Sequence, residues 1–324
     1  MNKTPLVSVI IPVYNGAKYI ESLLESFSNQ TYDNFELIFI NDGSTDNILE
    51  IIRTLKDKYC HNIQMFSQEN KGVSAARNLG IDKSAGEYIC FCDVDDYFDH
   101  RYIEQMLNVI FENNLSFAVC KLGRNISSKN CNIKNQVILY DENTFLEKFA
   151  TLDIVVVHYC LLINKEYLIH NKIRFSEGFR YGEDYDFAWK VIINGKNKIG
   201  YINYPLYNYI WRKGSAMTVF NETRYDTVRL YAKLEEYIEE RNRNFSVYFN
   251  KYWIARSVWS TMRQASSKVS FQQFLKIIDQ YDAKTRLRYL HDFKDKRIAF
   301  TSRLLCFSPK LFYFLFKTII YKVN

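Results

Sequence analysis

The feature of this sequence that most constrains its fold is an alternation between two hydrophobic periods over the first 120 residues. Short apolar runs rich in β-branched residues occupy 6–13, 35–41, 62–66, 87–92 and 116–120. Between them, apolar residues recur at helical spacing in 19–27, 46–55, 73–83 and 101–112. This alternation predicts an α/β fold with a mostly parallel sheet covered by helices on both faces. Ligands of such sheets bind outside the carboxyl ends of the strands, so the polar residues there are candidates for a site.

The last third of the chain has a different composition and a mainly helical pattern that begins at about residue 221. Residues 1–215 contain 23 Lys and Arg against 26 Asp and Glu, whereas residues 216–324 contain 20 against 10. The net charge therefore changes from −3 to +10 near a break at Gly214. We expect an α/β domain over 1–215 and a basic, aromatic helical region over 216–324.

Three carboxylates, Asp93, Asp95 and Asp96, follow the apolar run 88–92, which has the pattern of a buried strand. Strand alternation would place Asp93 and Asp95 on the same side, facing one ligand. Oxygen ligands of this kind suit a hard cation such as Mg²⁺ or Mn²⁺. The alternative is that Asp95 or Asp96 only caps the helix expected to begin near Asp99.

Two further polar residues lie close to predicted strand ends. Asp42 ends the second strand and can accept hydrogen bonds from a base or a ribose; alternatively, it forms an Asx turn that leads into the helix at Asp46. Arg77 lies on a helix among small neighbours that leave its guanidinium free to reach inward. Taken alone, an Arg on a helix is more often a solvated surface residue.

These segments together resemble a known family. The motifs are, in order, VIIPVYN (9–15), NDGSTD (41–46), NKGVSAARN (70–78), DVDD (93–96) and GEDYDF (182–187). In this order and approximate spacing they resemble the family 2 glycosyltransferases, inverting enzymes of the GT-A fold that use nucleotide-activated sugars. The resemblance covers roughly residues 5–215.

The resemblance implies a binding site for the donor. The residues that it places along the nucleotide pocket are Pro12, Tyr14 and Asn15. It implies that Asp42 contacts the base, that Arg77 contacts a base or a phosphate, and that Asp93 contacts the ribose. It also implies that Asp95, together with Asp93, holds Mn²⁺ or Mg²⁺ on the diphosphate.

The resemblance further implies that Asp184 is the catalytic base and that Glu183 orients the acceptor. Without the resemblance, both acids are interpreted as ordinary first-turn residues, because a helix N-terminus favours negative charge. Aromatic neighbours of Asp184 are expected to raise the pKa of its carboxyl. Downstream, Trp211 is expected to stack on the sugar and Arg212 to contact the diphosphate. His158 lies in an apolar run and is interpreted as a hydrogen-bonded core residue.

The segment 284–324 interleaves cations and aromatic residues, with ten Lys and Arg against two Asp and Glu. Its run 311–316 is too apolar for a solvent-facing segment and too short to span a bilayer. An interfacial segment on an anionic membrane fits both observations. The alternatives are a helix packed on the catalytic domain or a homodimer contact. Nucleic acid is not expected, because no known binding motif accompanies the charge.

The compartment is predicted from the cysteines and the hydropathy. The seven cysteines have no framework spacing, and the sequence nowhere contains 18 consecutive apolar residues. We expect a cytoplasmic protein, peripheral on the inner face of the cytoplasmic membrane.

Together these features predict a metal-dependent inverting glycosyltransferase that moves a sugar from a UDP-sugar to a saccharide acceptor. The acceptor is expected to be lipid-linked, or a precursor of lipopolysaccharide, capsule or O-antigen. One alternative is a sugar-nucleotide nucleotidyltransferase, which would need a Gly-rich basic loop after the first strand; 12–16 is not such a loop. The other is a non-catalytic carbohydrate- or membrane-binding relative, in which the carboxylate set would be broken.

Overall fold

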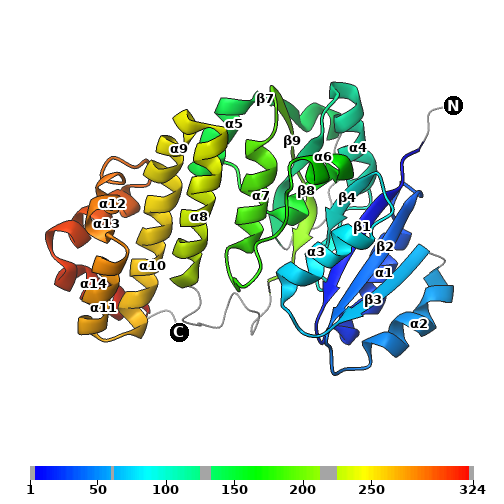
Figure 1. Cartoon of the computed structure of the whole chain (residues 1–324), viewed down its shortest axis with the longest axis horizontal. Helices are drawn as coiled ribbons and strands as arrows, with labels where there is room; N and C mark the ends of the chain where they lie inside the picture. Colours follow the sequence, from blue (N-terminus) through cyan, green and yellow to red (C-terminus); the bar gives the residue numbers. More distant parts are fainter. Residues whose placement is uncertain (1–3, 60–61, 125–132, 212–224, 321–324) are drawn as a thin grey trace. The chain divides into compact units, whose positions relative to one another are not determined.

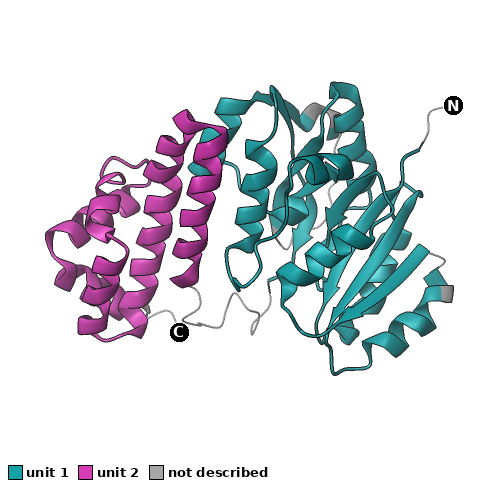
Figure 2. Cartoon of the chain, viewed as in Figure 1, with its two compact units in different colours: residues 1–220 teal, residues 221–324 magenta. Residues whose placement is uncertain are grey.

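The computed structural model describes residues 4–59, 62–124, 133–211 and 225–320 (Figure 1). The chain divides into two compact units, Met1–Phe220 (unit 1) and Asn221–Asn324 (unit 2), which Figure 2 distinguishes by colour. The domain boundary expected at 215/216 lies outside the described residues.

Unit 1 is built on one sheet, in which the described strands follow the order β3-β2-β1-β4-β8-β6-β9-β5, with β7 paired to β9. Its first four strands are parallel and comprise β3 (Asn62–Gln68), β2 (Phe35–Asp42), β1 (Val7–Val13) and β4 (Tyr88–Phe91). Every residue of β1 and β2 is buried. This explains their continuous apolar runs, because a parallel strand covered on both faces has no solvent side.

Helices follow each of these strands, as the alternation predicted (Figure 1). They are α1 (Ile20–Ser28), preceded by the 3₁₀ turn η1 (Ala17–Tyr19), α2 (Ile48–Tyr59), α3 (Val73–Lys83) and α4 (Tyr102–Asn113). Helix α3 packs closely on β1. At Gly80 there is no room for a Cβ atom, because it would collide with the side chain of Ile10 on β1. The predicted helices and strands of the first 120 residues are therefore confirmed, with ends shifted by a few residues.

The other half of the sheet is mixed. It contains β5 (Tyr97–Phe98), β6 (Phe117–Arg124), β7 (Val137–Asp141), β8 (Leu161–Asn164) and β9 (Lys198–Tyr209). Strand β8 runs antiparallel to β4 and β6, and β9 runs parallel to β6 but antiparallel to β5 and β7. The remaining elements of unit 1 are η2 (Ile133–Gln136), α5 (Glu142–Ala150), η3 (His158–Cys160), α6 (Lys165–His170) and α7 (Glu183–Ile193).

Unit 2 is helical throughout its described part, which confirms the expected helical C-terminal region (Figure 2). Its elements are α8 (Asp226–Arg241), α9 (Arg243–Phe249), the π-helical turn η5 (Asn250–Ile254), α10 (Ala255–Lys268), α11 (Phe271–Gln280), α12 (Ala283–Arg288), α13 (Lys296–Phe307) and α14 (Pro309–Ile320). Within the described ranges, no helix is both long enough and apolar enough to cross a membrane.

Candidate active site

The loops that leave β1 and β2 are joined by hydrogen bonds. The backbone N–H of Asn15 donates to Ser44 Oγ at 3.0 Å, and Asn15 Oδ1 accepts from the N–H of Thr45 at 2.8 Å. Asn15 has a φ of 52°, a left-handed conformation that Asn tolerates better than most residues. Of the predicted pocket residues, Tyr14 is exposed beside this junction, whereas Pro12 is buried within β1. The rim of the sheet is thus held in one geometry at this point.

Asp42 uses its carboxylate to hold the loop that precedes α3. Its Oδ1 accepts from Gln68 Nε2 and from the N–H of Lys71, both at 2.8 Å, and its Oδ2 accepts from the N–H of Gly72 at 2.9 Å. The Asx turn considered for Asp42 is made by its neighbour instead, since Asn41 Oδ1 accepts from the N–H of Ser44 at 2.9 Å. That alternative was therefore wrong by one residue.

Arg77 is the centre of a buried charge cluster. Its side chain is only 3% exposed, so the prediction of a solvated surface residue is wrong. Arg77 Nη2 lies 2.9 Å from Asp93 Oδ1, and Nη1 lies 3.3 Å from Glu183 Oε1. The guanidinium carbon lies 5.2 Å from the ring centre of Phe175. One cation thus connects the carboxylates after β4 with those that begin α7.

Asp93 has two cationic or titratable neighbours in this cluster. Burial opposes its ionisation, but the attraction of Arg77 outweighs it, and the pKa of Asp93 lies well below its usual range. His158 Nε2 lies 3.8 Å from Asp93 Oδ1, which is too long for a hydrogen bond. Burial and the charge of Arg77 lower the pKa of His158 to about 4, so its imidazole is neutral near pH 7.

The interpretation of His158 from the sequence was half right. The residue is buried, and its ring packs edge-on against Phe91 and Phe175. However, neither ring nitrogen has a hydrogen-bond partner within the described residues. His158 therefore lies beside the carboxylate cluster rather than in a satisfied part of the core, and no local sequence signal distinguishes these two situations.

The aspartates after β4 are placed by a turn. The strand ends at Phe91, and the N–H of Asp96 donates to the carbonyl of Asp93 at 3.1 Å. Strand alternation therefore does not position Asp93 and Asp95, contrary to the expectation. Asp95 is half-buried on this turn.

Asp96 was not predicted as a site residue, yet it anchors the turn. Its Oδ2 accepts from Tyr207 Oη at 2.7 Å, and its Oδ1 accepts from the N–H of Ile210 at 2.8 Å. Tyr207 Oη also accepts from the N–H of Asp93 at 3.3 Å. Burial and the nearby charge of Asp93 raise the pKa of Asp96 to about 7. Asp96 therefore ties the turn to β9 instead of capping α4.

We expect Tyr207→Phe to destabilise the protein by about 1–3 kcal/mol, because the buried carboxylate of Asp96 then loses one of its two donors and keeps only the N–H of Ile210. The measurement is the midpoint of urea unfolding. A matched control is Tyr97→Phe, because Tyr97 is an exposed residue whose Oη accepts from Asn208 Nδ2 at 2.9 Å; it should change stability by less than about 1 kcal/mol. Equal shifts in the two variants would contradict the anchoring role of Tyr207.

Glu183 and Asp184 begin helix α7, directly after Gly182. Gly182 has a φ of 88°, which glycine adopts without strain. Burial raises the pKa of both carboxyls, and the charge of Arg77 only partly opposes this. For Asp184 this is the direction expected from its apolar surroundings. The two acids are therefore more than solvated first-turn residues, since one contacts Arg77 and both are withdrawn from water.

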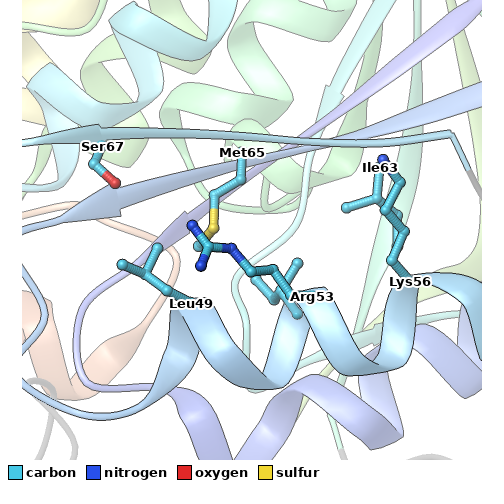
Figure 3. Close-up of a pocket in the computed structure, with 7 residues that line it drawn as sticks. Leu49, Arg53, Lys56, Ile63, Met65 and Ser67 are labelled. Atoms are coloured by element: carbon cyan, nitrogen blue, oxygen red, sulfur yellow. The ribbon is translucent and has the colours of Figure 1, made fainter.

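The remaining predicted residues are only partly placed. Trp211 is exposed at the end of a described range, and Arg212 lies outside the described residues. Throughout the described ranges, no group of three or more His, Cys, Asp or Glu side chains is arranged to hold a metal ion. A cavity of about 340 Å³ lies elsewhere, between α2 and β3 (Figure 3). None of the predicted site residues lines it; its walls are Leu49, Ile52, Arg53, Lys56, Ile63, Met65 and Ser67.

Known proteins resemble this chain in sequence and in fold. An uncharacterized glycosyltransferase of Rickettsia bellii (strain RML369-C) is 37% identical over 228 residues, or 68% of this chain and 30% of that protein. The chain spans between 30% and 50% of the length of the first three curated relatives. Among solved structures, S. aureus TarS 1–349 in complex with UDP-GlcNAc has a TM-score of 0.69 at 21% identity, covering 92% of this chain and 90% of that chain.

The mannosyltransferase PcManGT of Pyrobaculum calidifontis, in complex with GDP-Man and Mn²⁺, has a TM-score of 0.55 at 16% identity, covering 95% of this chain and 89% of that one. These likenesses show the fold, which is GT-A-like with a helical C-terminal region. Residues 8–170, just over half of the chain, match the family model described as Glycosyl transferase family 2. The chain therefore belongs to glycosyl transferase family 2.

Proposed function

We propose that the chain transfers a sugar from a UDP-sugar to a saccharide acceptor with inversion at the anomeric carbon. The observation that carries this proposal is the cluster around Arg77, where Asp93 from the end of β4 meets Glu183 from the start of α7. Arg77 and Asp93 are suited to contacts with a nucleotide diphosphate, and the carboxyls at the start of α7 are partly buried. The structures of TarS with UDP-GlcNAc and with UDP support a uridine nucleotide as the donor.

In this mechanism Asp184 removes the proton of the acceptor hydroxyl as its oxygen attacks the anomeric carbon. The bond between that carbon and the diphosphate oxygen breaks on the opposite face, which inverts the configuration. A raised pKa makes the Asp184 carboxylate a stronger base than an exposed Asp, and this favours proton transfer near neutral pH. Glu183, held by Arg77, orients the acceptor.

The donor contacts are assigned to the rim of the sheet. Pro12, Tyr14 and Asn15 line the nucleotide pocket, and Asp42, which holds the loop before α3, contacts the base. Asp93 contacts the ribose, and Arg77 contacts the base or a phosphate. Trp211 stacks on the sugar, and Arg212 contacts the diphosphate.

The Asp93–Asp95 turn fits a divalent cation of the hard type. Mg²⁺ binds through one or two carboxylates and completes its shell with substrate phosphates and waters, so a larger cluster of protein ligands is not required. Asp95, with Asp93 beside it, would hold Mn²⁺ or Mg²⁺ at this turn. When bound there, the cation stabilises the negative charge of the leaving diphosphate.

We expect UDP-sugars to raise the melting temperature in the presence of Mn²⁺, because a ligand that binds only the folded state stabilises it. The measurement is thermal unfolding with a panel of UDP-, GDP- and dTDP-sugars at equal concentration, with and without EDTA. Asp95→Asn should weaken the Mn²⁺-dependent part of the shift, whereas Asp82→Asn, an exposed surface acid, should not. A shift produced by GDP-sugars alone would overturn the choice of UDP.

The acceptor is proposed to be a lipid-linked saccharide, or a precursor of lipopolysaccharide, capsule or O-antigen, at the inner face of the cytoplasmic membrane. The supporting observation is that the segment 284–324 carries ten Lys and Arg against two acids, and that Phe300 and Phe307 are exposed in it. The roles of Asp184 and of the donor contacts do not depend on this choice, because a soluble saccharide acceptor would use the same base.

A further inference from the structure

Helix α13 exposes a regular stripe of cations and phenylalanines. Lys296, Phe300, Arg303 and Phe307 are spaced four, three and four residues apart, so their side chains lie on one face of the helix. All four are exposed; Phe300 is 62% and Phe307 is 87% exposed. Two large aromatic side chains thus point into solvent on one helix of 12 residues.

The opposite face of α13 is packed inside unit 2. Ala299, Ser302 and Leu305 are buried there. Trp259 Nε1 donates to Thr301 Oγ1 at 2.9 Å, which ties α13 to α10. The orientation of the stripe is therefore set by the core of the unit and not by chance exposure of a loose helix.

Helix α14 continues the same pattern after the single residue Ser308. Phe312 and Tyr313 are buried against Phe274 of α11, with ring centres 6.1 and 5.4 Å apart. On the other side of α14, Leu311 and Phe314 are about half exposed. Both helices therefore bury one face inside unit 2, an aromatic one in α14, and present exposed large apolar side chains on another face.

The charge around these faces selects the kind of partner. The segment 284–324 carries ten Lys and Arg against two acids. Both acids are already paired, Asp292 with Arg303 at 3.0 Å and Asp295 with Arg297 at 3.0 Å. A second copy of this chain would bring the same excess of positive charge, which disfavours self-association through this face. Anionic lipid offers both the opposite charge and an apolar interior for the phenylalanines.

We propose that the face defined by Lys296, Phe300, Arg303 and Phe307, extended by Leu311 and Phe314, docks on an anionic lipid surface. A helix of 12 residues is roughly 18 Å long, shorter than the hydrocarbon core of about 30 Å, so α13 and α14 lie on the bilayer. The inference deepens the proposed function, on which it rests, because it brings a lipid-linked acceptor and the enzyme to one surface.

The test is flotation of the full chain with vesicles of phosphatidylcholine and phosphatidylglycerol at 7:3, and with phosphatidylcholine alone. The wild type should float with the anionic vesicles only, and 500 mM NaCl should weaken binding. Phe300→Ser with Phe307→Ser should lower vesicle binding at least tenfold. Lys296→Gln should lower it roughly fivefold. The matched control is Val247→Ser, which replaces an apolar residue of unit 2 that is 71% exposed but lies on α9.

Flotation of the double Phe variant at the wild-type level would overturn the proposal, provided that its melting temperature shows a folded protein. A wild type that stays with the soluble fraction would also overturn it. Dimers of the wild type that the double Phe substitution disperses would identify a second copy of the chain as the partner and would overturn it too.

UDP-sugar binding is measured on the same samples. Vesicle binding without UDP-sugar binding would reject the proposed function, whereas UDP-sugar binding without vesicle binding would reject only the docking on lipid.

Discussion

Replacing Asp184 with Asn is expected to lower the rate of sugar transfer by about 10²–10⁴-fold while donor binding is retained. An amide is nearly the same size as a carboxyl and can still accept from the N–H of Tyr185, which donates to Asp184 Oδ1 at 2.8 Å. It cannot remove a proton from the acceptor. The measurements are the turnover of a UDP-sugar with a saccharide acceptor and the thermal shift produced by the same donor.

The matched control is Glu177→Gln, a carboxyl-to-amide change at an exposed residue that accepts from Asn78 Nδ2 at 2.8 Å. It should leave turnover within a few-fold of the wild type. Turnover of Asp184→Asn at the control level would reject the role of Asp184. Loss of the donor-induced shift in Asp184→Asn would show instead that the substitution damages the donor site.

The pH dependence gives a second readout of the same base. Only the ionised carboxylate can accept the proton, and burial raises the pKa of Asp184 from its ordinary value. The rate should therefore fall as the pH decreases, and the fall should occur at a higher pH than the value of about 4 typical of an exposed Asp. A rate that stays constant down to pH 4 would contradict a buried carboxylate base.

Replacing Arg77 with Met is expected to destabilise the protein by about 3–5 kcal/mol, because Asp93 and Glu183 then lose the buried cation between them. Met preserves much of the apolar length of the side chain, so the change reports mainly on charge. The measurement is equilibrium urea unfolding at pH 8 and at pH 5.

The sign of the pH effect follows from linkage. In the wild type the folded pKa of Asp93 is depressed, so its stabilising effect is present above the unfolded pKa and is lost as the pH falls through the folded value. In the Met variant the pKa values of Asp93 and Glu183 rise, and protonation relieves the unpaired charges. The destabilisation should therefore be smaller at pH 5 than at pH 8.

Arg174→Met is the matched control, because Arg174 pairs with Asp82 at 2.9 Å on the surface. It should cost at most about 1 kcal/mol at either pH. If Arg77→Met were no more harmful than this control, the buried cluster would not contribute to stability in the way that its geometry indicates.

The predicted and observed structures differ most where local patterns are weak. Strand β9 was not predicted, because Gly200 and Pro205 interrupt its apolar pattern and neither is typical of a strand interior. The pairing of β9 with β6 is irregular, with register shifts on both sides of Lys121. The antiparallel insertion of β8 between β4 and β6 was also not predicted, since strand order depends on contacts between distant segments.

The sequence by itself determined the α/β class, the helical character of the last third and the set of motifs along one edge of the sheet. These properties depend on hydrophobic period and on residue order, which are local. Only the tertiary structure decided that Arg77 lies between Asp93 and Glu183, 16 and 106 positions away, and that Asp96 binds Tyr207, 111 positions away. Such partners are selected when packing excludes water, because a buried charge is then stable only beside a group that compensates it.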